Sequence, residues 1–149
     1  MGSVHEREIS RDNKMPLSQR IAVTLSSGTS VTDTIERVKW AEENGYEDGW
    51  MADSGAPDSL TLMAALAGYA PTLRLGIAVA PVYSRTPAVF AATANTLGQL
   101  MPGRVILGLG ASSQTMMDQW HGVPLQKPLT RVKETATMVR SMLAGEKSN

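Results

Sequence analysis

The amino-acid sequence predicts an α/β protein in which parallel strands form a sheet covered by helices. Four short apolar segments alternate with segments of helical periodicity, so the predicted order is βαβαβαβα with short connections. The strand segments are apolar on both faces, which is typical of strands buried in a parallel sheet. An open doubly wound sheet and a barrel of repeated βα units both satisfy this pattern, and no local repeat distinguishes them.

Each predicted strand is an apolar run that stops at small or polar residues. The four strands cover residues 20–25, 48–53, 73–81 and 104–110. Ligands bind at the carboxyl ends of the strands in both architectures, so the residues at those ends form the candidate site. These residues are Ser26 and Ser27, Asp53 and Ser54, residues 79–83, and residues 110–113.

Helical segments follow the strands, and several of them carry clear end signals. The first two cover residues 30–45 and 58–70, and the third begins with Thr86 as its cap and Pro87 at its first position. A short helical piece over residues 113–122 precedes a longer helix from about Pro128. Apolar stripes predict the buried faces of these helices. The stripes comprise Val31, Ile35, Val38 and Ala41 in the first helix, Phe90, Ala94, Leu97 and Met101 in the third, and Leu129, Val132, Ala136, Val139 and Leu143 in the last.

The composition argues against several classes of function. Lys plus Arg and Asp plus Glu both number 14, and without a basic excess we expect no nucleic-acid partner. The absence of cysteine excludes disulfides, thiolate nucleophiles and Cys-ligated metals. No apolar run reaches the roughly 20 residues that a membrane span needs, so we expect no membrane association and a cytoplasmic protein. The polar residues 1–15 predict a disordered tail, and residues 16–149 predict a single folded domain.

The segment from Gly108 to Ser113 lies between the fourth strand and a helix. Backbone N–H groups at such a place can receive an oxyanion, and small residues let the backbone approach it closely. The same residues also fit a turn in which a serine caps the helix. The segment is a poor Rossmann fingerprint, because it follows the fourth strand and lacks the third glycine. A phosphate site and a capping turn therefore both stay open.

Two ionisable residues are further candidates. Asp53 ends an otherwise apolar strand, where it accepts a hydrogen bond from a ligand or caps the following segment. His121 is a candidate because histidine side chains in general titrate near neutrality and suit acid–base chemistry, but beside Trp120 at a helix end it also fits a structural role. No grouping of His, Asp and Glu has the spacing of a metal site. The residues alone thus predict a protein that binds an anionic small molecule, without defining a reaction.

Three segments in order carry a family resemblance: AEENGYEDGWMAD, the run from Thr72 to Ser113, and QWHGVPLQKPLTRVKE. From about Ile21 to Glu146 the sequence resembles the luciferase-like monooxygenase superfamily, and in particular its oxidoreductases that use the deazaflavin coenzyme F-420, such as methylenetetrahydromethanopterin reductases. The resemblance implies a (β/α)8 TIM barrel, of which four βα units make about half. It also implies hydride transfer between the coenzyme and a small-molecule substrate.

The resemblance further implies roles for particular residues. Gly110, Ala111 and Ser112 would contact the phosphate-bearing tail of the coenzyme. Asp53 would approach the deazaflavin ring, and a non-prolyl cis peptide between Ala78 and Val79 would lie behind that ring. His121 remains the candidate acid–base group.

The sequence also departs from the family pattern. Ser54 stands where some members have an active-site histidine, and residues 110–113 replace a more polar Gly-Thr-Gly-Glu. An FMN-dependent monooxygenase of the same superfamily and a non-catalytic half-barrel that binds a ligand or partner are therefore alternatives. Half a barrel leaves strand edges and apolar side chains uncovered, so we expect either a homo-oligomer or a missing C-terminal half.

Overall fold

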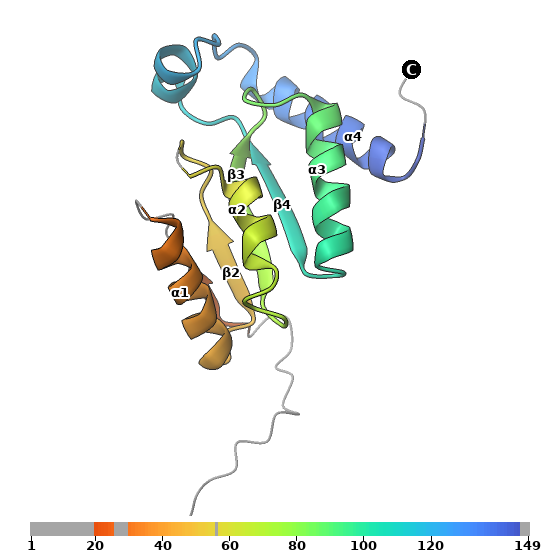
Figure 1. Cartoon of the computed structure of the whole chain (residues 1–149). Coiled ribbons are helices and arrows are strands. Elements are labelled where there is room, and N and C mark those ends of the chain that lie inside the picture. The colour runs from red at the N-terminus through yellow and green to blue at the C-terminus, as the bar shows by residue number, and fades with distance from the viewer. Residues whose placement is uncertain (1–19, 26–29, 56, 147–149) are drawn as a thin grey trace, which may run out of the picture.

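The computed structural model describes residues 20–25, 30–55 and 57–146. These residues contain one four-stranded parallel sheet with the strand order β1-β2-β3-β4. The sheet is open, and its strands follow one another in chain order (Figure 1). This arrangement confirms the parallel α/β class and corresponds to part of the wall of a βα barrel. The strands are β1 (Ala22–Thr24), β2 (Asp48–Met51), β3 (Arg74–Pro81) and β4 (Val105–Gly110).

Helices alternate with the strands as the sequence predicts. Figure 1 shows the first three helices side by side in front of the sheet, with α4 beyond α3. The short helical piece after β4 contains a single π-helical turn, and none of the helices within the described ranges is long and apolar enough to cross a membrane. The elements are α1 (Val31–Glu43), α2 (Ser59–Leu66), α3 (Pro87–Leu100), the π turn η2 (Met116–Trp120) and α4 (Pro128–Leu143).

Polar side chains fix the starts of the first three helices. The oxygen of Ser30 accepts from the N–H of Asp33 at 3.3 Å, and that of Asp58 accepts from the N–H of Thr61 at 2.8 Å. Thr86 caps α3 as predicted, with Pro87 at its first turn. Because each cap satisfies an otherwise unpaired N–H group, the chain leaves its loop at a defined residue.

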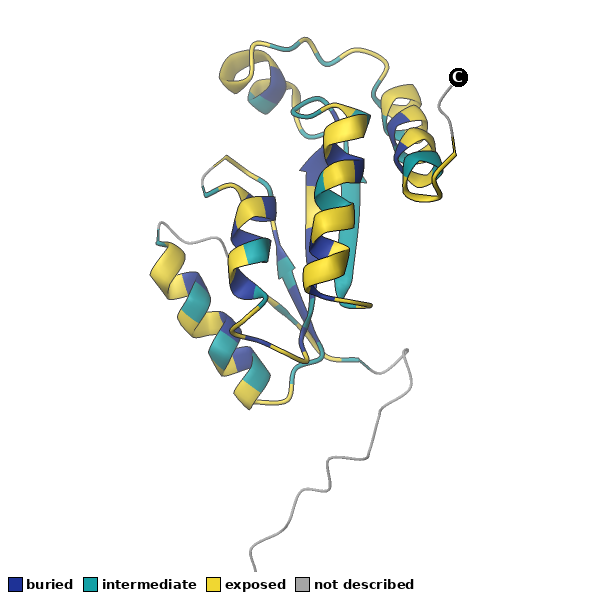
Figure 2. Cartoon of the chain, turned by 45° about the vertical axis from the view of Figure 1, so that its right-hand side comes forward, coloured by how far each residue is buried: buried dark blue, intermediate teal, exposed yellow. Residues whose placement is uncertain are grey.

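The core lies between the helices and one face of the sheet. Leu25 directly after β1, Met51 of β2 and Ile77 of β3 are buried in this layer, where Met63 and Phe90 from the helices are also fully buried. The opposite face is far less covered: Ala22 and Thr24 are exposed and β4 is half-buried throughout (Figure 2). Within the described residues, helices therefore cover only one face of the sheet.

Two of the predicted helix stripes are partly wrong. Val31, Leu129 and Leu143 are exposed by 46%, 87% and 49%, whereas Thr34 and Thr135 are buried in their place. Packed helices cross at an angle, so a stripe is buried only where the crossing occurs. In α4 the side of the helix around residues 135–139 is buried, and both ends of the stripe lie outside it. The predicted tail, and Ser26 and Ser27 after β1, lie outside the described residues.

Candidate functional site

The carboxyl half of β3 contains an irregularity at Ala78 and Val79. The peptide bond between these residues is cis, which confirms the geometry predicted there. The pairing of β3 with β4 also shifts at this point, because Ile77 faces Leu107 while Ala80 faces Leu109. Two residues of β3, Ala78 and Val79, thus lie opposite the single residue Gly108 of β4, and both are exposed between buried neighbours.

The glycines of β4 fit against this bulge. A Cβ atom on Gly108 would lie closer to the carbonyl oxygen of Ile77 than van der Waals contact allows, and one on Gly110 would overlap the side chain of Val79. Both positions therefore need glycine so that the neighbouring strand can approach. Packing alone explains these two residues, a cause that the sequence pattern did not reveal.

The residues after β4 form a turn closed by serine side chains. The oxygen of Ser113 accepts from the N–H of Met116 at 3.3 Å, which agrees with the capping interpretation. Ser112 has a left-handed backbone with φ 68°, and its hydroxyl donates to the sulfur of Met116 at 3.4 Å. Both hydroxyls thus contact the short helical segment that follows.

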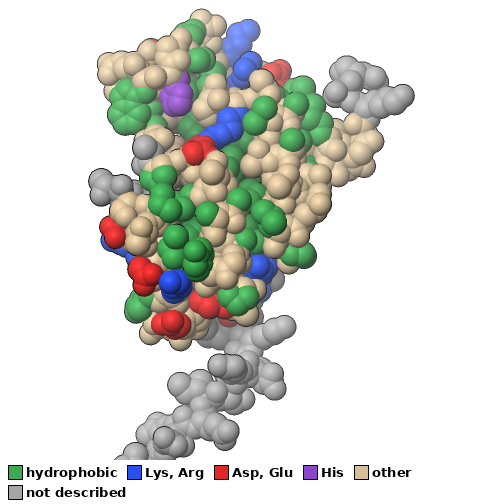
Figure 3. Space-filling view, in the orientation of Figure 1, with side chains coloured by type: hydrophobic (Ala, Val, Ile, Leu, Met, Phe, Trp, Pro, Cys, Tyr) green, Lys and Arg blue, Asp and Glu red, His purple; other side chains and the backbone are tan. Residues whose placement is uncertain are grey.

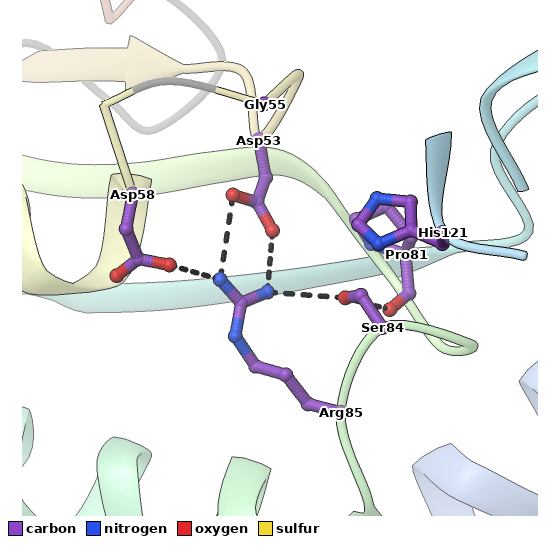
Figure 4. A pocket seen from close by; sticks show the side chains of 7 residues that line it. All are labelled: Asp53, Gly55, Asp58, Pro81, Ser84, Arg85 and His121. Carbon is purple, nitrogen blue, oxygen red and sulfur yellow. Dashed lines mark hydrogen bonds and ion pairs between the residues drawn. The ribbon is translucent and has the colours of Figure 1, made fainter. Parts of the chain in front are cut away.

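Asp53 is bound by an arginine that the sequence analysis missed. Nη1 of Arg85, in the loop between β3 and α3, donates to Oδ2 of Asp53 at 2.5 Å, and Nη2 lies 3.5 Å from Oδ1. The side chain of Asp53 is only 8% exposed and that of Arg85 only 18%. Nη2 also donates to Asp58, the cap of α2, so that one guanidinium joins two loops (Figure 4). The only signal in the sequence was a single basic residue directly before the cap Thr86.

Arg85 and the carboxylates of Asp53 and Asp58 form an ionic cluster, in which hydrogen bonds favour the charged forms of Arg85 and Asp58. Burial lowers the pKa of Arg85, but its hydrogen bonds to Asp53 and Asp58 outweigh that effect and raise the pKa above its ordinary value. Burial likewise raises the pKa of Asp58, while hydrogen bonds from Thr61 and Arg85 lower it below its ordinary value. The guanidinium also lies over the ring of Phe90, 5.8 Å from its centroid, which favours the cation.

The cluster borders a cavity of about 180 Å3 at the carboxyl ends of β2 and β3. The structure brings Asp53 and His121 together in its lining (Figure 4), and His121 is exposed. Figure 3 shows a histidine side chain, in purple, at the surface of the molecule. Ala78, Val79 and residues 110–112 are absent from the lining and lie at or beside the strand ends. Within the described ranges, no three His, Asp or Glu side chains form a group that could hold a metal ion. The lining residues are Asp53, Gly55, Asp58, Pro81, Ser84, Arg85 and His121.

The size of the cavity and its hydrogen-bond acceptors determine which part of a coenzyme it can hold. The cavity is smaller than the roughly 300 Å3 at which pockets for whole ligands begin, so it accommodates only part of a large ligand. Its carboxylates accept hydrogen bonds, which suits the N–H edge of a flavin-like ring. The residues present therefore fit one end of such a coenzyme.

The strand order β1-β2-β3-β4, with helices on one face of the sheet, is typical of (β/α)8-barrel proteins. The polar side chains of the cavity lie at the carboxyl ends of the strands, where such barrels bind ligands. Residues 15–149 match the family of luciferase-like monooxygenases, and the chain belongs to this family. The resemblance noted in the sequence is thereby confirmed.

The relatives of the chain include a reductase and an F-420-dependent dehydrogenase. The chain is 34% identical over 110 residues to 5,10-methylenetetrahydromethanopterin reductase of Methanolobus tindarius, covering 73% of the chain and 33% of the reductase. It is 32% identical over 121 residues to the F-420-dependent glucose-6-phosphate dehydrogenase of Microbacterium testaceum, covering 72% of the chain and 35% of that enzyme. The chain therefore spans about a third of the length of these relatives.

Solved structures show the same fold. The coenzyme F-420-dependent tetrahydromethanopterin reductase of Methanopyrus kandleri superposes with a TM-score of 0.74 at 23% identity, over 82% of this chain and 39% of the reductase. The oxygenating component of 3,6-diketocamphane monooxygenase from Pseudomonas putida, solved with FMN, gives a TM-score of 0.68 at 20% identity, over 77% of this chain and 35% of the monooxygenase. At these identities the likeness concerns the fold alone.

Proposed function

We propose that this chain binds the deazaflavin coenzyme F-420 at the carboxyl ends of β2, β3 and β4 and serves an oxidoreductase that acts on a small-molecule substrate. The observation that carries the proposal is the buried pair of Asp53 and Arg85 in the cavity at the carboxyl ends of β2 and β3. The family match and the F-420-dependent relative support it. When bound, the coenzyme would supply hydride transfer, and the protein would supply position and exclusion of water.

The residues divide between the two ends of the coenzyme. Asp53 would accept a hydrogen bond from the ring, and Ala78-Val79 would lie behind it. Gly110, Ala111 and Ser112 would border the tail. His121, exposed at the rim of the cavity, is the candidate that would donate or take a proton.

The alternative coenzyme is FMN, with monooxygenation as the reaction. It is supported by the FMN-bound monooxygenase that shares this fold. A non-catalytic binding module is the third possibility, because the chain spans about a third of the relatives it matches. The three differ in what they bind and in whether they turn over, so a binding titration followed by a turnover assay separates them.

Titration of the purified chain into coenzyme F-420, followed by the fluorescence of the coenzyme, tests the proposal, with FMN titrated in parallel. Saturable binding of the deazaflavin and not of FMN is the expected result. Binding of FMN alone would favour the monooxygenase, and binding of neither would contradict the proposed function. Oxidation or reduction of the bound coenzyme with candidate substrates then separates an enzyme from a binding module.

The same proposal includes association of this chain with a partner chain. The sheet face opposite the helices carries exposed residues on β1 and on the bulge of β3, and we expect association with a second copy or with a separate C-terminal half to cover it. Sedimentation velocity on the chain alone checks this expectation. A dimer would support self-association, whereas a stable, well-folded monomer would contradict it.

A further inference from the structure

The hydrogen bonds of Arg85 leave its terminal nitrogens fully occupied. Nη1 donates to Oδ2 of Asp53 at 2.5 Å and to Oγ of Ser84 at 3.3 Å. Nη2 donates to Oδ1 of Asp53 at 3.5 Å and to Asp58. Each terminal nitrogen of a guanidinium carries two hydrogens, so every one of these hydrogens has an acceptor within the protein. The hydroxyl of Ser84 is also engaged, since it donates to the carbonyl of Pro81 at 2.9 Å.

The charged residues of the cluster make the lining of the cavity negative overall. Asp53 and Asp58 carry one negative charge each and Arg85 one positive charge, which leaves a net negative charge. Arg85 is also the only Lys or Arg in the lining of this cavity. Within the lining, then, the one strong cation has no terminal N–H for a ligand anion. The carboxylate of Asp53 still has free lone pairs, because an ionised carboxyl group accepts about four hydrogen bonds.

From this arrangement we infer that the cavity takes an uncharged, hydrogen-bond-donating part of a ligand, such as an imide N–H or a hydroxyl, and rejects phosphate and carboxylate groups. Arg85 is then a positioning residue: it holds the carboxylate of Asp53 in one orientation and does not bind the ligand itself.

The inference rests on the proposed function and gives the coenzyme an orientation. The donor-bearing edge of the ring would enter the cavity of about 180 Å3, which is large enough for only part of the molecule. The anionic tail would be directed away from the net negative cluster, toward the segment from Gly110 to Ser112. A substrate group that reached the same cavity would likewise be neutral.

A pair of arginine variants tests the positioning role. Arg85→Gln removes the cation that orients Asp53, and Arg74→Gln is the matched control, because Arg74 pairs with an equally buried carboxylate at the other end of the sheet. We expect the dissociation constant for coenzyme F-420, measured by fluorescence, to rise about tenfold or more in Arg85→Gln. It should stay within about twofold in Arg74→Gln, although both variants melt at lower temperature.

If coenzyme binding is weakened equally in the two variants, Arg85 has only a structural role, and the inference is overturned. Unchanged coenzyme binding in Arg85→Gln would overturn it as well. Failure of the wild type to bind either coenzyme would overturn the proposed function, and this inference with it. Normal wild-type binding with no difference between the variants would overturn the inference alone.

A second experiment tests the rejection of anions. The probe is a deazaflavin without the anionic tail, so that phosphate bound in the tail region does not displace it. Inorganic phosphate should compete poorly with this probe in the wild type and about tenfold better in the double variant Asp53→Asn, Asp58→Asn, in which both negative charges that neutralise the guanidinium are removed. If the double variant does not fold, Asp58→Asn alone keeps the cap and removes one of the two negative charges paired with Arg85. Equal competition in the wild type and the variant that folds would overturn the inference.

Discussion

Two arginine–carboxylate clusters lie at opposite ends of the same sheet, and they differ in what holds them. At the amino end, Nε and Nη2 of Arg74 donate to Asp48 at 2.6 and 2.8 Å, and Arg20 lies 3.9 Å from the same carboxylate. At the carboxyl end, Arg85 joins Asp53. Each arginine holds a carboxylate that is 8% exposed, so burial alone does not distinguish the clusters.

The difference lies in the backbone beneath them. Asp48 and Arg74 are direct partners in the register of β2 with β3, so the pairing of the strands places them together. Asp53 and Arg85 follow those strands in loops, and they meet only because both loops fold over the strand ends. The amino end of a βα barrel commonly serves stability and the carboxyl end function. Here the pair on the strands, Asp48 and Arg74, is absent from the cavity lining, and the pair in the loops borders the cavity.

The largest effect on folding is expected from breaking the amino-end cluster. Asp48→Ala leaves Arg74 and Arg20 without their shared carboxylate, and we expect the free energy of unfolding to fall by about 3 kcal/mol. Urea denaturation measures this change, and coenzyme binding should persist. Glu36→Ala, which breaks an exposed pair with Lys39, is the control and should cost less than about 1 kcal/mol. If Asp48→Ala abolished coenzyme binding without lowering the free energy of unfolding, the amino end of the sheet would not serve stability alone, and the contrast between the two ends would be wrong.

A second variant disturbs the carboxyl end without changing a charge. Gly108→Ala places a methyl group against the carbonyl of Ile77, and we expect a loss of about 2 kcal/mol in the free energy of unfolding. Gly98→Ala is the matched control: it lies inside α3 with no atom near its Cβ position, and it should stabilise the protein by up to about 1 kcal/mol. Unchanged stability in Gly108→Ala would show that packing is not the reason for this glycine.

A smaller effect concerns Asp58 and depends on pH. Its pKa is lowered in the folded state, so the unfolded state binds more protons near the ordinary value of about 3.9. The carboxylate therefore stabilises the fold above that pH, and this contribution is lost as the pH falls through the lowered pKa. Because the side chain is 45% exposed and screened by solvent, we expect less than about 1 kcal/mol.

The measurement is the difference in unfolding free energy between the wild type and Asp58→Asn as a function of pH. Asparagine keeps the cap of α2, so the substitution removes only the charge. The difference should shrink below about pH 4 and with added salt. A difference that is constant with pH would argue against an ionic role for Asp58.

The smallest effect on folding is expected at His121, the exposed residue at the cavity rim. His121→Ala should leave the free energy of unfolding within about 0.5 kcal/mol. In an assembly that turns over, we expect it to slow the reaction by about 100-fold with little change in coenzyme affinity. Unchanged turnover would remove His121 from the catalytic candidates.

The sequence predicted some residues of the candidate site and missed others. It identified Asp53 and His121, which the structure brings to one cavity, and the family resemblance predicted the cis peptide at Ala78-Val79. It did not predict Arg85, because the partners of that guanidinium are 32 and 27 residues away in the chain. The glycines of β4 were interpreted from their local pattern, whereas the atoms that require them belong to β3.

The sequence by itself determined the order of strands and helices, the cap at Thr86 and the family, because periodicity, caps and motifs are local properties of the chain. Only the tertiary structure decided which residues of each apolar stripe are buried, and that one arginine holds two carboxylates beside the cavity. Those features depend on helix crossings and on two loops meeting over the strand ends. Such contacts join distant residues, and no local pattern in the sequence specifies them.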